Sequence, residues 1–181
     1  MLSKNPSLDR SNAIDAADVL NDLLSDFITG TMIFRNGKAQ LLSGNLSLVN
    51  MADLQRMCVS TLALAFSKYG EFYKHYHQLI PSSRRKVCKD LLKDIKTREI
   101  DTFRDRVIGH IWAKEHGRPL KHSEVMQMLD AMVKSDFNSF LDWINNPNNN
   151  IYPATVVSIV ETLRDEIAKE YSIQPEEIVN R

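Results

Sequence analysis

Three residues within a seven-residue stretch could together act on a phosphodiester: Arg104, Asp105 and His110. Metal-free cleavage of RNA needs a base for the 2′-OH proton, an acid for the 5′-oxygen leaving group and a fixed cation for the developing phosphorane charge. Histidine titrates near neutral pH and can serve as base or acid. Arginine keeps its charge and binds two phosphate oxygens at once. The stretch therefore predicts phosphodiester chemistry.

The spacing of these residues restricts how one helix could present them. Six residues of a straight α-helix rotate by about 600°, which leaves Arg104 and His110 about 120° apart. Arg106 and His110 are four apart and share a face, so Arg106 is a reserve phosphate ligand. Three arrangements could still bring an arginine and a histidine together. The helix could distort near Gly109, the long Arg104 side chain could extend around the helix, or a partner subunit could supply the missing residue.

Basic residues gather in the middle of a chain whose net charge is zero. Residues 83–122 hold twelve lysines and arginines but six acidic residues. Such a stretch indicates contact with a polyanion, whereas the alternative is an ordinary solvated helix face. On the first interpretation, Arg98, Arg106 and Lys114 are expected to bind RNA phosphates.

The hydrophobic periodicity predicts five or six helices and no convincing strand. We expect helices over residues 12–34, 49–79, 83–111, 123–144 and 153–171, with a possible break near Thr97. The expected N-caps are Asn12, Ser82 or Ser83, and Ser123, and Pro153 lies near the first turn of the last helix.

The segment from Met32 to Leu42 is ambiguous. Asn36-Gly37 is a strong hairpin signal, but the first helix could equally run to Phe34 with Gly37 as its C-cap. We favour the helix, because an isolated hairpin would have no sheet to join.

These elements predict one all-α domain, a helical bundle over residues 12–171, with a flexible segment 1–11 and a C-terminal tail 172–181. The N-terminus lacks the apolar core of a signal peptide, and the longest apolar stretch, 59–66, is too short to cross a bilayer. Cys58 and Cys88 show no CxxC spacing, which is typical of reduced thiols. We expect a cytoplasmic protein without a membrane partner.

Neither a metal nor a cofactor is expected. The chain contains no GxxxxGK[ST], GxGxxG, GxSxG or HExxH motif. His75 and His77 point about 200° apart on a helix, which makes them a poor metal pair. His116 and His122 lie in or beside a loop without a carboxylate or thiolate arranged for a metal.

The segment Phe103-Arg104-Asp105-Arg106-Val107-Ile108-Gly109-His110 resembles the RxxxxxH signature of the HEPN superfamily. The Lys/Arg-rich helix before it, and the loop and helix after it, are similar to the abortive-infection branch of that superfamily. The likeness extends loosely over residues 49–171. Gly109 departs from the alanine that is commoner before the histidine.

This resemblance implies a HEPN-like bundle that forms a homodimer, with motifs from two subunits in one cleft, and metal-independent endoribonuclease activity. Arg104 would hold the scissile phosphate, Asp105 would orient the site, and His110 would be the acid or base. Such proteins often act as toxins in toxin–antitoxin or phage-defence systems, frequently beside a nucleotidyltransferase-type antitoxin. Two alternatives stay open: a catalytically silent HEPN protein that binds a nucleotide or an antitoxin, and a structural or adaptor bundle.

Overall fold

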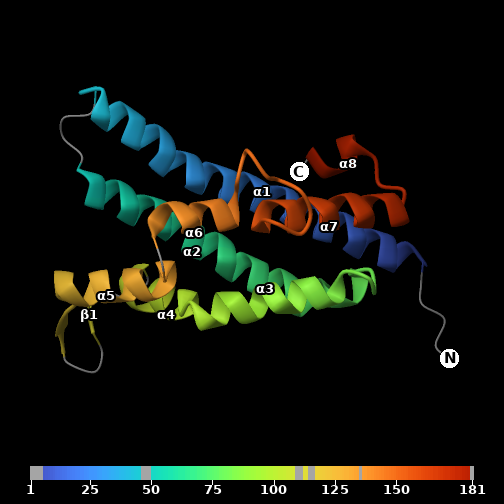
Figure 1. Ribbon diagram of the computed structural model, residues 1–181. Coiled ribbons are helices and arrows are strands. Elements are labelled where there is room, and N and C mark those ends of the chain that lie inside the picture. The colour runs from blue at the N-terminus through green and yellow to red at the C-terminus, as the bar shows by residue number, and fades with distance from the viewer. Residues whose placement is uncertain (1–5, 46–49, 109–111, 114–116, 135, 180–181) are drawn as a thin grey trace.

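The computed structural model describes residues 6–45, 50–108, 112–113, 117–134 and 136–179 (Figure 1). This part of the chain forms one all-α domain, as predicted. Six of its α-helices have eight residues or more, and α4 and α8 are shorter. The helices are α1 (Pro6–Leu42), α2 (Met51–Tyr76), α3 (Arg85–Thr97), α4 (Ile100–Phe103), α5 (His122–Val133), α6 (Phe137–Ile144), α7 (Val156–Glu170) and α8 (Pro175–Val179).

Two very short strands correct the expectation that the chain has none. β1 (Trp112–Ala113) pairs with β2 (Arg118–Pro119) in an antiparallel ladder. Between α2 and α3, the residues His77–Leu79 form a single 3₁₀ turn. None of the described helices combines the length and the apolarity needed to span a bilayer.

α1 and α2 run antiparallel and carry much of the core (Figure 1). Gly30 and Gly37, two turns apart on α1, face α2. A Cβ at Gly30 would lie 2.6 Å from Cδ2 of Leu62, and one at Gly37 would lie 2.6 Å from Cδ2 of Leu54. Because glycine has no side chain, the two helices approach closely at both levels. Other α1 residues fill the core at three- and four-residue spacing: Ala13, Ala16, Ala17, Leu20, Leu23, Leu24 and Phe27.

α1 is longer than predicted at both ends. It begins at Pro6, whose fixed φ suits a first helical turn, so residues 6–11 are helical and Asn12 is not its N-cap. The helix interpretation of residues 32–42 is confirmed, but Gly37 is not the C-cap. The helix ends at Leu42, and Gly44 takes the positive φ of 77° that terminates it.

The expected helix over residues 123–144 is wrong, because the structure divides it into α5 and α6. Lys134, directly after α5, has a φ of 67°. The Asp136 carboxylate then begins α6 by accepting a hydrogen bond of 2.9 Å from the backbone N–H of Ser139. The buried residues Val133 and Phe140 are seven apart, so the apolar pattern runs in phase across the break and hides it.

Several other helix boundaries differ from the predicted ones. The break near Thr97 is confirmed, and Glu99 adopts a left-handed φ of 52° there. The predicted serine caps are wrong, since Arg84 and Lys121 occupy the N-cap positions of α3 and α5. α7 begins after Thr155, not at Pro153. At the C-terminus, α8 is tied to α1 by an ion pair of 2.8 Å between Arg10 and Glu177.

α6 and α7 cover the α1–α2 pair on one side (Figure 1). Trp143 of α6 stacks on Phe66 of α2, with ring centroids 5.3 Å apart, and Phe66 also packs against Phe27 at 4.9 Å. Buried aromatic pairs of this kind add about 0.5–1.5 kcal/mol to the free energy of unfolding beyond their buried area. This side of α2 is therefore fully occupied by the core.

Candidate functional site

The predicted site begins in an irregular helical turn. Directly after α4, the residues Arg104–Ile108 adopt π-helical conformation, and none of their five side chains is buried. π-helical turns are rare and are found frequently at functional sites. Helix distortion before Gly109 is one of the three arrangements that the spacing left open. Gly109 and His110 themselves lie outside the described residues.

Arg104 and Asp105 lie together and face solvent. Nε and Nη2 of Arg104 donate to the same Oδ1 of Asp105, at 2.8 Å and 2.6 Å. The two side chains are 36% and 60% exposed. The structure thus brings together two of the three predicted catalytic residues, at the surface and at the start of the irregular turn.

α4 holds the beginning of this turn against α2. Ile100 and Phe103 are buried in the core, and the Ser67 hydroxyl of α2 donates to Oδ1 of Asp101 at 3.1 Å. Four residues are a short helix, so its position depends on these tertiary contacts more than on its own propensity.

The three predicted phosphate ligands have different surroundings. Arg106 is exposed in the π-helical turn, two residues after Arg104. Lys114 lies outside the described residues. Arg98 is not brought to Arg104 and Asp105: its Nη1 donates to the carbonyl oxygens of Met132 and Val133, at 3.0 Å and 3.1 Å.

Arg98 has a structural position that the sequence did not reveal. Its guanidinium lies 4.2 Å from the ring centroid of Trp143, and burial lowers its pKa from the usual value. Because it satisfies two carbonyls at the C-terminal end of α5, the guanidinium joins three elements of the fold.

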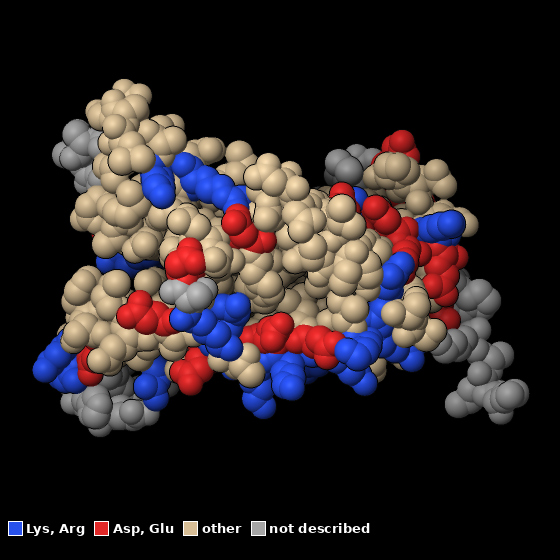
Figure 2. All heavy atoms as spheres, viewed as in Figure 1, with Lys and Arg blue, Asp and Glu red and all other residues tan. Residues whose placement is uncertain are grey.

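The basic stretch 83–122 does not form a continuous positive surface. On the face shown in Figure 2, basic and acidic side chains alternate along the edge over α3. Arg84 forms a two-pronged ion pair with Glu166, and Lys86 pairs with Asp90 at 2.7 Å. The net charge of the stretch therefore overstates the positive charge available to a polyanion.

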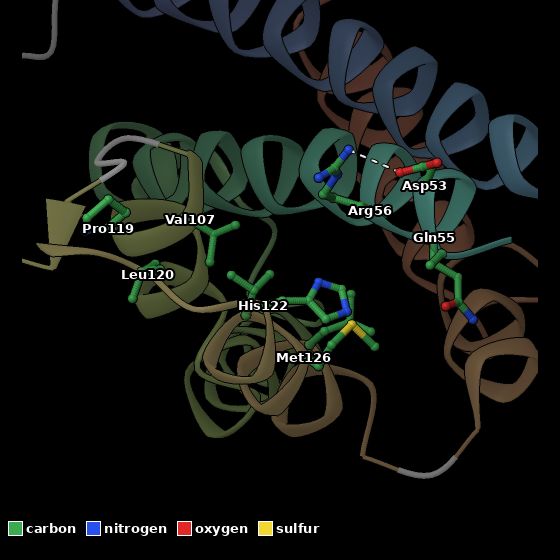
Figure 3. Close-up of a pocket in the computed structure, with 11 residues that line it drawn as sticks. Asp53, Gln55, Arg56, Val107, Pro119, Leu120, His122 and Met126 are labelled. Atoms are coloured by element: carbon green, nitrogen blue, oxygen red, sulfur yellow. Dashed lines mark hydrogen bonds and ion pairs between the residues drawn. The ribbon is translucent and has the colours of Figure 1, made fainter. Parts of the chain in front are cut away.

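A pocket of about 380 Å³ lies beside the π-helical turn, between α2 and α5 (Figure 3). Its walls are largely apolar and include Val107 from the turn and Leu120, Met126 and other residues around α5. In Figure 3 the His122 ring extends from the start of α5 towards the part of α2 that carries Arg56. Volume and lining are in the range of small-molecule sites.

Arg118 binds the first turn of α5 near this pocket. Its Nη1 and Nη2 donate to the two carboxylate oxygens of Glu124 at 2.9 Å and 2.8 Å. The hydrogen bonds from Arg118, together with one from the Lys121 N–H, lower the pKa of Glu124 to about 2. Sequence analysis did not identify this pocket, because the residues of α2 and α5 that form it meet only in the folded chain.

The described residues contain no group of three or more histidine, cysteine, aspartate or glutamate side chains that could hold a metal ion. Both cysteines are buried, and burial raises the pKa of Cys58 to about 12. A thiol with so high a pKa is unreactive at neutral pH.

Comparison with known proteins identifies a shared fold. No family model and no curated protein matches the sequence. Among solved structures, the chain is similar to the integron cassette protein Vpc_cass2 from the mobile metagenome of V. paracholerae, with a TM-score of 0.73 and 19% identity. The match covers 87% of this chain and 96% of that chain. At this identity, the likeness shows a common all-α architecture and leaves the activity to be argued from the site.

Proposed function

We propose that this protein is a metal-independent endoribonuclease of HEPN type, with Arg104, Asp105 and His110 as its working residues. The observation that carries the proposal is the exposed Arg104–Asp105 pair in a π-helical turn that ends two residues before His110 in the sequence. An arginine held at the surface on an irregular turn, close in sequence to a histidine, is suited to bind a phosphodiester.

The Arg104–Asp105 contact is weak enough for RNA to replace it. Ion pairs at this exposure contribute about 0–1 kcal/mol, so a phosphate can draw the guanidinium away from Asp105. Arg104 then stabilises the charge that develops on the phosphorane. His110 takes the 2′-OH proton as the 2′-oxygen attacks phosphorus and gives it to the 5′-oxygen as the P–O5′ bond breaks. Asp105, released from Arg104, accepts a hydrogen bond that orients the 2′-OH or the imidazole.

The proposed phosphate-binding set is smaller than the one expected from sequence. Arg106 stays in it because it is exposed in the same turn, and Lys114 stays in it as a prediction. Arg98 is removed from the phosphate-binding set, because binding phosphate would strip two carbonyls of their hydrogen bonds.

The resemblance also supports a toxin or phage-defence role with a nucleotidyltransferase-type antitoxin, and the mobile-metagenome origin of Vpc_cass2 is consistent with that role.

The test is cleavage of purified tRNA and mRNA in EDTA by the wild type, His110→Ala and Arg104→Ala. We expect 2′,3′-cyclic phosphate ends from the wild type and a loss of at least about 100-fold in each variant. This is the scale of a lost proton-transfer group for His110 and of lost charge stabilisation for Arg104. His75→Ala is the matched control, since His75 is an exposed histidine on α2, where it lies near Glu71. No cleavage by the wild type, or equal cleavage by His110→Ala, contradicts the proposal.

The pocket beside Val107 favours a second function, a catalytically silent protein that binds a nucleotide. Its apolar walls suit a base, and Arg56 and His122 suit a phosphate. In that case calorimetry detects AMP or GMP binding that Met126→Trp abolishes by filling the pocket, while RNA stays intact. A purely structural bundle would show neither nucleotide binding nor salt-sensitive RNA binding.

A further inference from the structure

The pocket between α2 and α5 has two chemically different parts (Figure 3). Apolar side chains from the π-helical turn and from around α5 form one part, among them Val107, Leu120 and Met126. Two charged side chains from the first two turns of α2, Asp53 and Arg56, belong to the other. Such a pocket suits a planar ring with polar edges, because the faces of the ring meet apolar atoms while its edge meets charged ones.

Asp53 and Arg56 form a pair that a ligand could open. Nη2 of Arg56 donates to Oδ1 of Asp53 at 3.2 Å. The side chains of Arg56 and Asp53 are 64% and 37% exposed, and an exposed ion pair of this kind is weak. A guanidinium has several further N–H donors, and a carboxylate has several lone pairs. The pair therefore presents a donor and an acceptor side by side on one wall of the pocket.

We infer that this pocket holds a guanine base of the RNA substrate, next to the phosphodiester that Arg104 binds; the inference rests on the proposed ribonuclease function. Guanine carries an acceptor, O6, beside two donors, the N1–H and the N2 amino group. Arg56 donates to O6, and the Asp53 carboxylate accepts from N1–H and from N2. The His122 ring, which extends towards this part of α2 (Figure 3), stacks on the base.

The same two charged groups disfavour the other three bases. Adenine and cytosine carry an amino group where guanine has O6, and this amino group would face the guanidinium of Arg56. Uracil presents O4 and N3–H as guanine presents O6 and N1–H, but its O2 would face the carboxylate of Asp53 in place of a donor. Gln55 also lines the pocket, but it adds no preference because its amide both donates and accepts. Guanine is the base that satisfies both charged groups.

The position of the pocket relates the base to the cleaved bond. Val107 lines the pocket and follows Arg104 by three residues in the same π-helical turn. Residues three or four apart on a helix surface are neighbours, with Cβ atoms about 5–6 Å apart. A base and the phosphate of its own nucleotide are separated by a distance of this order. In this arrangement Arg56 reads a base edge, whereas in the nucleotide-binding alternative it binds a phosphate.

The test is cleavage of a single-stranded RNA of random sequence in EDTA, with sequencing of both ends of every cut. We expect the wild type to cut beside guanine at least about tenfold more often than beside any other base, the scale of discrimination by one bidentate pair. Asp53→Asn and Arg56→Gln should each lose most of this preference. Glu71→Gln is the matched control, because Glu71 and Lys74 form an exposed pair of the same spacing at 3.3 Å farther along α2. Circular dichroism checks that every variant is folded.

Binding of nucleoside monophosphates supplies a measurement independent of cleavage. Calorimetry should find GMP bound at least about tenfold more tightly than AMP, UMP or CMP by the wild type and by Glu71→Gln, and no such preference in Asp53→Asn. Cleavage without a preference for guanine, a preference that survives Asp53→Asn and Arg56→Gln, or its loss in Glu71→Gln overturns the inference and keeps the proposed function. A protein that binds GMP in this way but cuts no RNA keeps guanine recognition and refutes the proposed ribonuclease.

Discussion

The α1–α2 pair and the segment from Ile100 to Val133 differ in backbone regularity and in the exposure of their side chains, although both belong to one domain. The first region consists of two long, regular helices whose inward faces are buried, with glycines at the points of closest approach. The second contains a four-residue helix, a π-helical turn, a two-residue strand pair and one helix. Its charged side chains are largely exposed. Irregular backbone and exposed charge are tolerated there because the first region carries much of the buried core.

The largest expected contrast between the regions is in the cost of losing a leucine side chain. Leu62 is fully buried between α1 and α2, and Leu62→Ala should lower the free energy of unfolding by about 2–5 kcal/mol. Leu120 is half-buried at the pocket, so Leu120→Ala should cost less than half as much. Urea denaturation measures both, and equal costs would show that the second region is packed as tightly as the first.

A second contrast compares two arginines from the basic stretch. Arg98→Ala removes charge-assisted hydrogen bonds to two carbonyls, which should cost about 1.5–3 kcal/mol of unfolding free energy. Arg104→Ala removes an exposed pair and should stay within about 0.5 kcal/mol of the wild type. Thermal unfolding measures both. A large loss in Arg104→Ala would assign Arg104 a structural role instead of one on RNA.

Two glycines of the first region should respond with opposite signs. Gly30→Ala places a Cβ 2.6 Å from Leu62, and overpacking of this kind costs about 1–3 kcal/mol of unfolding free energy. Gly70→Ala meets nothing within 4 Å and should stabilise α2 by up to about 1 kcal/mol. Denaturation midpoints of the two variants give the comparison; destabilisation by both would mean that Gly70 has a role beyond helix propensity.

The smallest effect concerns acid stability at the start of α5. The folded-state pKa of Glu124, about 2, lies below that of an unfolded glutamate. Its contribution to stability is therefore complete above roughly pH 4.5 and is lost as the pH falls towards 2. Carboxyl-detected NMR should titrate Glu124 near pH 2 in the wild type. In Arg118→Gln the midpoint should rise but stay below the unperturbed value of about 4.3, because the hydrogen bond from the Lys121 N–H remains. An unchanged midpoint in the variant would exclude Arg118 as the cause.

Sequence reasoning succeeded where hydrophobic periodicity alone determines structure. The break near Thr97 and the all-α class follow from spacing and local propensity. It failed at boundaries set by tertiary contacts: Gly37 looks like a C-cap but serves the approach of Leu54, and the in-phase pattern across Lys134 concealed the end of α5.

The candidate site shows the same limit. Arg104 and Asp105 could be found from residue types and spacing, because adjacent residues stay together in any fold. Arg98 has the same charge and lies in the same basic stretch, yet its role depends on Trp143 and on the end of α5. The pocket likewise requires α2 to meet α5, and nothing in the periodicity of either helix specifies that contact.

Two residues with a positive φ, Glu99 and Lys134, mark the start and the end of the second region. They lie close together, since the Lys134 ammonium donates to the Thr97 hydroxyl at 3.2 Å and Arg98 holds the Val133 carbonyl. The second region thus begins and ends at one place in the fold. In evolutionary terms this is the geometry of an insertion: such a segment can be lengthened, exchanged or specialised while the remaining helices keep their packing.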